Sequence, residues 1–144
     1  MKHILSIITV FFILLTSSVS WGVEKKGLIC QCTLCLSDKL QRGFWFEGGK
    51  VYKRFFQQVN DNFVTVSDDN GKLFSTSSEQ IEWWDYFDYR INRQSLTLKT
   101  LLGGELETQS NCDVFNEVEF EKTWKTIKDQ HQNSYNKKLK KNKI

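Results

Sequence analysis

Apolar and polar positions alternate in short runs between residues 27 and 115, and turn residues separate the runs. From Gly27 to Leu36 the even positions are all leucine or cysteine, whereas the odd positions include Gln31 and Thr33. Successive side chains of a strand point to opposite faces, so this pattern is typical of a strand with one buried face.

Turn residues predict a series of hairpins. The chain contains no proline, so glycine, asparagine and aspartate must supply the turns. Gly48 and Gly49 lie between two aromatic-rich runs, which is the pattern of a two-residue hairpin turn. The segment 63–75 predicts a second hairpin around residues 69–71, and the segment 89–102 predicts a third.

The last predicted strand, residues 105–115, follows a turn at Gly103-Gly104. Its Leu106, Cys112 and Val114 are expected to share one face. Short strands joined by local turns form an antiparallel meander. We therefore expect a mainly β domain, folded as a small antiparallel barrel or sandwich.

After Phe115 the apolar period lengthens to three or four residues, which predicts a helix. Asn116 followed by Glu119 fits the capping box at a helix N-terminus. The apolar stripe is narrow and consists of Phe120, Trp124, Ile127, His131, Tyr135 and Leu139. We expect an amphipathic C-terminal helix whose first half rests on the β domain and whose second half frays.

The N-terminus has the order of a secretory signal peptide, with Lys2, an apolar run over residues 4–15, and small residues before a cut at Trp21. The alternative is an uncleaved membrane anchor, because residues 4–23 carry no charge and approach the length of a membrane helix. Cleavage is favoured because the following lysines would make the exported flank basic, against the positive-inside tendency.

This interpretation divides the chain into three parts: a signal peptide (1–20), a β domain (21–115), and a helix with a basic tail (116–144). The expected localisation is periplasmic or secreted. The alternative is attachment to the membrane through the uncleaved N-terminal segment.

The formal net charge of +3 is unevenly distributed. All 17 acidic residues precede the last eight residues, KKLKKNKI, which carry five lysines. The positive charge of a nucleic-acid-binding domain spreads over a folded face, so this distribution predicts no nucleic-acid partner. Membrane contact is expected only through an uncleaved signal segment or weakly through the tail.

Three of the four cysteines, Cys30, Cys32 and Cys35, lie within six positions, and the fourth is Cys112. A four-thiolate metal site is disfavoured because such sites usually combine two close pairs on turns. A thiol-disulfide redox protein using Cys32 and Cys35 remains an alternative, although thioredoxin-type chemistry needs this motif at a helix N-terminus. We expect neither a metal nor another cofactor.

Structural disulfides are the preferred interpretation, because exported proteins mature where thiols are oxidised. The first-ranked pairing joins Cys30 to Cys112 and Cys32 to Cys35, and the second joins Cys32 to Cys112 and Cys30 to Cys35. Both connect the first strand to the last. A free thiol at Cys35 is a further alternative.

The segment IEWWDYFDYRI, residues 81–91, holds the densest group of aromatic residues. Its odd positions form a core face that Asp85 interrupts, which predicts a turn there. Its even positions then face outward: Glu82, Trp84, Tyr86 and Asp88. Rings beside carboxylates suit a sugar or peptide ligand, because stacking and hydrogen bonding are available together.

In the alternative, which we favour, the C-terminal helix packs over Trp84 and Tyr86 through Phe120 and Trp124. No catalytic residue is assigned. The chain after residue 20 retains a single histidine, His131, and a hydroxyl or thiol nucleophile normally needs a positioned base beside it.

The signal peptide, the early strand with Cys30, the glycine turns, the segment 91–99 and the late Cys112 together resemble a group of small uncharacterised exported β proteins of marine alphaproteobacteria. That group implies no activity. The outline is also similar to periplasmic inhibitors of c-type lysozyme. Those inhibitors carry a Ser-Gly-x-x-Tyr loop, whereas here Gly49 and Tyr52 have the right interval and a glycine replaces the serine.

The sequence therefore predicts an exported, disulfide-stabilised, non-catalytic binding domain whose partner is an unidentified protein or glycan. A thiol-disulfide redox protein and a lysozyme-inhibitor-like protein are the alternatives. The resemblance to the inhibitors is an analogy of outline, and a fold alone does not imply a function.

Overall fold

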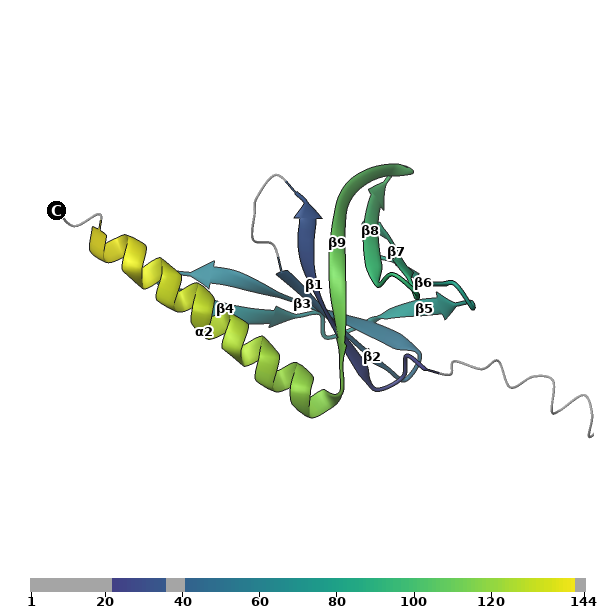
Figure 1. The fold of residues 1–144 in the computed structure, drawn as a ribbon, viewed down its shortest axis with the longest axis horizontal. Helices are drawn as coiled ribbons and strands as arrows, with labels where there is room; N and C mark the ends of the chain where they lie inside the picture. The colour runs from purple at the N-terminus through teal and green to yellow at the C-terminus, as the bar shows by residue number, and fades with distance from the viewer. Residues whose placement is uncertain (1–21, 36–40, 142–144) are drawn as a thin grey trace, which may run out of the picture.

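The computed structural model describes residues 22–35 and 41–141 (Figure 1). The predicted signal peptide, residues 1–20, and the last three residues of the basic tail lie outside the described residues. No helix within the described ranges is long and apolar enough to cross a membrane.

Nine antiparallel strands of the described chain form one closed sheet (Figure 1). The strands are β1 (Lys26–Leu34), β2 (Gln41–Glu47), β3 (Lys50–Val59), β4 (Asn62–Ser67), β5 (Lys72–Thr76), β6 (Gln80–Trp84), β7 (Asp88–Asn92), β8 (Thr97–Leu102) and β9 (Glu105–Phe115). Eight of them form a barrel in the order β1-β9-β8-β7-β6-β5-β3-β2, and β4 pairs on β3 as an extra strand. The predicted fold class, a mainly β barrel with a C-terminal helix, is confirmed.

Local turns connect most neighbouring strands, as the turn residues predicted. At the β2–β3 turn, Gly48 and Gly49 have φ angles of 61° and 71°, a left-handed conformation that glycine adopts without steric cost. The predicted hairpins β7–β8 and β8–β9 are also present.

The hairpin predicted over residues 63–75 is wrong. β4 and β5 do not pair with each other, because both pair with β3. β3 is ten residues long, so its first residues pair with β5 and its second half, from Arg54 to Val59, pairs with β4. The tight turn lies instead between β3 and β4, where Asn60 has a φ angle of 55°.

β9 does not keep one face along its length, so the shared face predicted for Leu106 and Cys112 is wrong. Cys112 is buried, whereas Leu106 is 50% exposed. The register shifts between Thr100, which pairs with Thr108, and Leu101, which pairs with Leu106. The extra β9 residue of this bulge exchanges the two faces beyond it.

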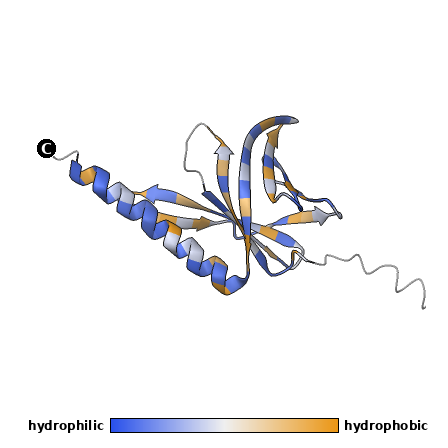
Figure 2. Cartoon of the chain, viewed as in Figure 1, coloured by the Kyte–Doolittle hydropathy of each residue, from blue (hydrophilic) through white to orange (hydrophobic). Residues whose placement is uncertain are grey.

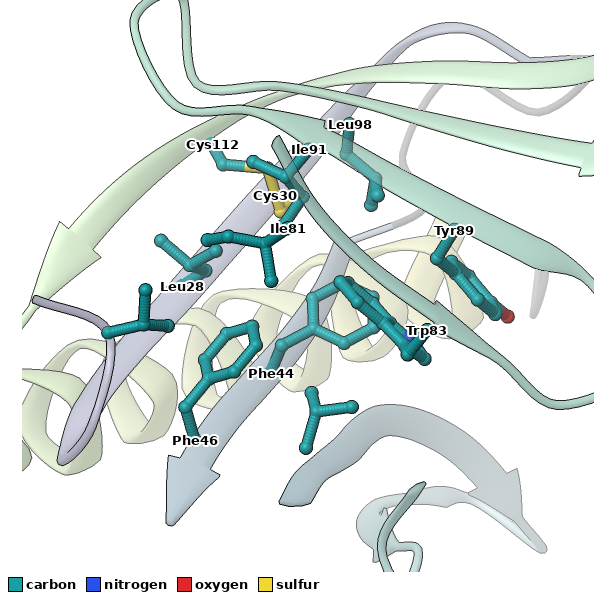
Figure 3. Close-up of a cluster of buried hydrophobic side chains, with 12 residues drawn as sticks. Leu28, Cys30, Phe44, Phe46, Ile81, Trp83, Tyr89, Ile91, Leu98 and Cys112 are labelled. Carbon is teal, nitrogen blue, oxygen red and sulfur yellow. A yellow bond between two sulfur atoms is a disulfide. The ribbon is translucent and has the colours of Figure 1, made fainter. Parts of the chain in front are cut away.

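Aromatic rings fill much of the barrel interior (Figure 3). The rings of Trp83 and Tyr89 stack with centroids 5.0 Å apart, and Phe44 meets Trp83 edge-on at 5.1 Å. The largest interior side chains are buried almost completely: Phe44, Phe46, Val51, Tyr89, Ile91 and Leu98. Residues 81–91 supply the core face that their odd positions predicted.

The helix α2 (Glu117–Lys141) begins with the predicted capping box. The backbone N–H of Glu119 donates to Oδ1 of Asn116 at 3.0 Å, and the backbone N–H of Asn116 donates to Oε2 of Glu119 at 3.3 Å. Two orphan donors of the first turn are thereby satisfied.

The first half of α2 packs on the outer face of β1 and β2. Phe120 and Trp124 are buried there against Ile29 and Trp45. A side chain at Gly27 of β1 would collide with the Phe120 ring, so the absent Cβ allows the close approach. The protein therefore has a second apolar cluster, outside the barrel.

The second half of α2 does not fray within the described residues, and that prediction is wrong. The Gln132 side chain accepts a hydrogen bond from the backbone N–H of Phe63 at 2.8 Å. The Tyr135 hydroxyl donates to Asp61 at 3.1 Å. The extra strand β4 thus gives the helix a second support, which the apolar stripe alone did not indicate.

The structure contains the first-ranked disulfide pairing. Cys30 of β1 and Cys112 of β9 are opposite each other in the sheet and joined by a disulfide, with Cα atoms 3.9 Å apart (Figure 3). A second disulfide joins Cys32 to Cys35. The first crosses a sequence separation of 82 residues, and the second a separation of three.

Replacing Cys30 and Cys112 together by alanine is expected to lower the free energy of unfolding by about 4 kcal/mol, because the unfolded chain regains the entropy of a long loop. Urea denaturation measures this loss. The matched control, Cys32→Ala with Cys35→Ala, opens a very short loop and is expected to lose about 2 kcal/mol or less by the same relation. Equal losses in the two double variants would contradict the structural role of Cys30–Cys112.

Candidate functional site

The β6–β7 hairpin is held by a polar turn at Asp85. The Asp85 carboxylate accepts a hydrogen bond from the backbone N–H of Phe87 at 2.8 Å, and the Asp85 N–H donates to the Phe87 carbonyl at 3.1 Å. Lys53 of β3 reaches across the end of the barrel and donates to Asp85 at 3.0 Å and to the Tyr89 hydroxyl at 3.2 Å. These contacts fix the tip that carries Tyr86.

The protonation states of Lys53 and Asp85 favour this ion pair. Burial by itself lowers the pKa of Lys53, but the hydrogen bond to Asp85 and the interaction with Tyr89 outweigh burial and raise that pKa. Burial by itself raises the pKa of Asp85, but the Phe87 N–H and Lys53 outweigh burial and lower that pKa. Both side chains are therefore charged over a wide pH range.

The contribution of this pair to stability should depend on pH. Because the folded pKa of Asp85 is below its ordinary value of 3.8, the stabilisation is present above that pH and is lost as pH falls through the folded pKa. Because the folded pKa of Lys53 is above 10.5, the stabilisation is also lost as pH rises beyond that value.

We expect Asp85→Asn to lower the free energy of unfolding by about 1 kcal/mol at neutral pH. The difference from the wild type should begin to shrink below about pH 4, and it should disappear as pH falls through the lower pKa of Asp85 in the folded protein. Urea denaturation at several pH values measures it, with exposed Asp69→Asn as the control. A difference that stays constant into strong acid would contradict the ion pair.

Trp84 and Tyr86 are exposed beside this turn. Trp84 is 71% exposed at the end of β6, and Tyr86 is 72% exposed at the tip of the hairpin. The favoured prediction that α2 covers these rings is wrong, because Phe120 and Trp124 pack on the outer face of β1 and β2 instead. The even positions of 81–91 face outward, as the alternation predicted.

Glu82 and Asp88 lie on the same outer face and share a cation. Trp84 pairs with Asp88 across the hairpin, and Glu82 pairs with Arg90. The Arg90 guanidinium donates to Asp88 at 2.6 Å and lies 3.7 Å from the Glu82 carboxylate. The hydrogen bond to Asp88 raises the pKa of Arg90. Arg90 was not among the predicted site residues. It pairs with Glu82 and therefore faces outward with it.

A groove of about 510 Å³ adjoins these residues on the outer face of β6–β9. It is lined by Gln80, Arg90, Asn92, Ser95, Thr97, Lys99, Leu101 and Gln109. Most of these side chains are amides, hydroxyls or cations. β9 curves strongly beside β8 in Figure 1. The sequence pattern did not predict this groove. The groove forms between four strands, and their order in the sheet depends on how the whole barrel closes.

The structure brings together all four predicted site residues, Glu82, Trp84, Tyr86 and Asp88, on one hairpin. Chemically, the hairpin and its groove offer flat rings, hydrogen-bond donors and acceptors, and an ion-paired cluster. No group of three or more His, Cys, Asp or Glu in the described part of the chain is arranged to hold a metal ion.

The Cys32–Cys35 pair lies next to Gln109, one of the residues that line the groove. Cys32 is near the end of β1, next to an irregularity of the β1–β9 register, and its Sγ lies 3.3 Å from the Gln109 carbonyl. Both cysteines are only partly buried. A strand position does not supply the helix dipole that lowers a thiol pKa in redox proteins.

The segment compared with the lysozyme inhibitors is the β2–β3 turn. Gly49 lies in the turn, and Tyr52 lies on β3 with its ring against the outer apolar cluster and Gly71. The resemblance stays a prediction.

The chain matches no protein-family model, and no curated protein or solved structure shows significant similarity to it.

Proposed function

We propose that this protein is an exported, non-catalytic binding domain and that the outer face of β6–β9 binds a glycan. The observation that carries the proposal is the exposure of Trp84 and Tyr86, 71% and 72%, beside a polar groove. The described part of the chain leaves these large rings exposed to water. Exposed aromatic residues next to convergent polar groups are typical of a binding site.

The chemistry of the face suits sugars better than an apolar ligand. The Trp84 ring offers a flat apolar surface for the C–H face of a pyranose, while Asp88 and Arg90 hydrogen-bond at its edge. The groove supplies amides and hydroxyls, each able to pair with a sugar hydroxyl. A single sugar contact of this kind is weak, so several units would bind together.

The face does not support hydrolysis of the bound glycan. Glycoside hydrolases need one carboxyl group that donates a proton and a second that acts as base or nucleophile. Here Asp88 and Glu82 flank the same guanidinium, at 2.6 Å and 3.7 Å. Both carboxylates therefore interact with Arg90. This arrangement favours a binding role over catalysis.

Two disulfides support maturation in an oxidising compartment, such as the periplasm or the exterior of the cell. The signal-peptide pattern of residues 1–20 agrees with this destination. Attachment through an uncleaved N-terminal segment is the alternative, and it would leave the binding face in the same compartment.

Trp84→Ala is expected to abolish binding to oligosaccharides that the wild type retains on a glycan array. Its free energy of unfolding should change by less than about 0.5 kcal/mol, because the ring is largely exposed. Isothermal titration calorimetry measures the affinity, and urea denaturation measures the stability.

Leu73→Ala is the matched control, because Leu73 is an equally exposed apolar residue, at 77%, on the neighbouring strand β5. This variant should bind like the wild type. Unchanged binding by Trp84→Ala would contradict the proposal, and so would binding that Leu73→Ala weakens to the same extent.

A further inference from the structure

A row of amide side chains crosses the outer surface of the barrel. Gln80 of β6 pairs with Asn92 of β7. On the other side, Thr97 of β8 pairs with Asn111 of β9, which in turn pairs with Gln31 of β1. Paired residues of neighbouring strands point to the same face. Ile91 of β7 pairs with Leu98 of β8. The next residues, Asn92 and Thr97, therefore lie side by side on the outer face and join the two parts of the row.

The row continues beneath the helix. Gln31 pairs with Gln41 of β2, and the Gln41 side chain lies 3.1 Å from Nε2 of His131 on α2. Six strands therefore carry one line of polar, mostly amide side chains, from the β6–β9 groove to the second half of α2. None of these side chains is fully buried.

A second groove, of about 560 Å³, lies at the far end of this row. Four glutamines from three strands and the helix contribute to its lining: Gln31, Gln41, Gln58 and Gln130. Tyr135 and Lys138 of α2 line the same space. The groove lies between the second half of α2 and the strands. Contacts of the helix with the β3–β4 hairpin, such as that of Tyr135 with Asp61, hold this part of the helix in place.

Two cations of the described chain line the first groove, namely Lys99 and Arg90, which is paired with Asp88 and Glu82, and the second groove is also positively charged. Among the described residues that line it, none is acidic, and Lys138 contributes a positive charge. The last two turns of α2 also carry Lys137, Lys140 and Lys141, and Figure 2 shows this part of the helix as predominantly hydrophilic. Four ammonium groups outweigh the partial negative charge of a helix C-terminus. This end therefore favours an anionic group.

Polar side chains are expected on the solvent face of an antiparallel sheet, so the amide content of this row is its informative feature. Asparagine in particular has a low strand propensity. An amide presents both donors and an acceptor, so a line of amides offers the alternating partners that successive sugar hydroxyls need. A nucleic acid would instead require positive charge along the row, and the row itself is neutral.

We propose that the amide row and the α2 groove bind one extended chain of an acidic polysaccharide, whose carboxylate-bearing sugars lie beside Lys138. The inference rests on the proposed function, because it makes the Trp84 face one end of a longer site. Neighbouring strands are about 4.8 Å apart, so a row across six strands spans about 24 Å along the surface. Binding should therefore strengthen with chain length.

The probes are galacturonic acid oligomers of three and eight units, with the fully methyl-esterified octamer as the uncharged counterpart. Calorimetry with the purified protein should show tighter binding of the acidic octamer than of the trimer or the ester. Lys138→Ala should weaken octamer binding about tenfold, the equivalent of one charge-assisted hydrogen bond, and leave trimer binding unchanged. Gln31→Val should act in the same direction, because it interrupts the row.

Each variant has a matched control. Lys125→Ala removes the same charge from an exposed position on the first half of α2, and Gln57→Val replaces an exposed glutamine of β3 that lines neither groove. Both should bind the octamer like the wild type. Urea denaturation of all four variants verifies that each is folded.

The outcomes separate this inference from the proposed function. Octamer binding that depends on Trp84 but not on Lys138 or Gln31 would overturn the extended site and leave the sugar-binding face intact. Octamer binding that depends on none of the three residues would overturn both. Single-stranded DNA that binds as tightly as the octamer, with the same dependence on Lys138, would overturn the assignment to a polysaccharide.

Discussion

The pairing of β1 with β9, locked by the Cys30–Cys112 disulfide, closes the chain on itself. These strands are the first and last of the barrel, and the paired cysteines lie at the same level of the sheet. Both are almost completely buried among the interior side chains. A domain of this size has a limited core, so a covalent link between its two ends contributes a substantial part of its stability. Every other strand lies within the loop that this bond closes.

The closed barrel has two outer faces that differ in what packs on them. α2 covers β1 and β2, where the missing side chains of Gly27 and Gly43 allow Phe120 and Trp124 to approach the sheet. Among the described residues, no helix covers the face of β6–β9, where Trp84 lies exposed near charged and amide groups. The helix therefore determines which of these two faces is covered in the described part of the chain.

Local patterns predicted the elements that depend on neighbouring residues. The Gly48-Gly49 turn, the Asn116–Glu119 capping box and the inward odd positions of 81–91 are all recognisable within a few residues. The outward direction of Glu82, Trp84, Tyr86 and Asp88 follows from the same alternation. These features could be predicted because their physical causes are local.

The remaining features depend on contacts between distant segments. β3 pairs with both β4 and β5. This double pairing depends on the length of β3 and on the closure of the barrel. The β9 bulge moves Leu106 to the outer face, although the alternation continues through it. The position of α2 depends on its fit against Gly27 and Gly43, which are far from the helix in the sequence. Both grooves lie between elements whose neighbours the sequence pattern does not specify.

The most direct test of this account is a non-reducing peptide map of the protein recovered from outside the cytoplasm, with fragmentation that separates the three clustered cysteines. The account predicts one bond between Cys30 and Cys112 and another between Cys32 and Cys35. Recovery of Cys112 as a free thiol, or bonded to Cys35, would contradict the closure of the barrel on which the rest depends.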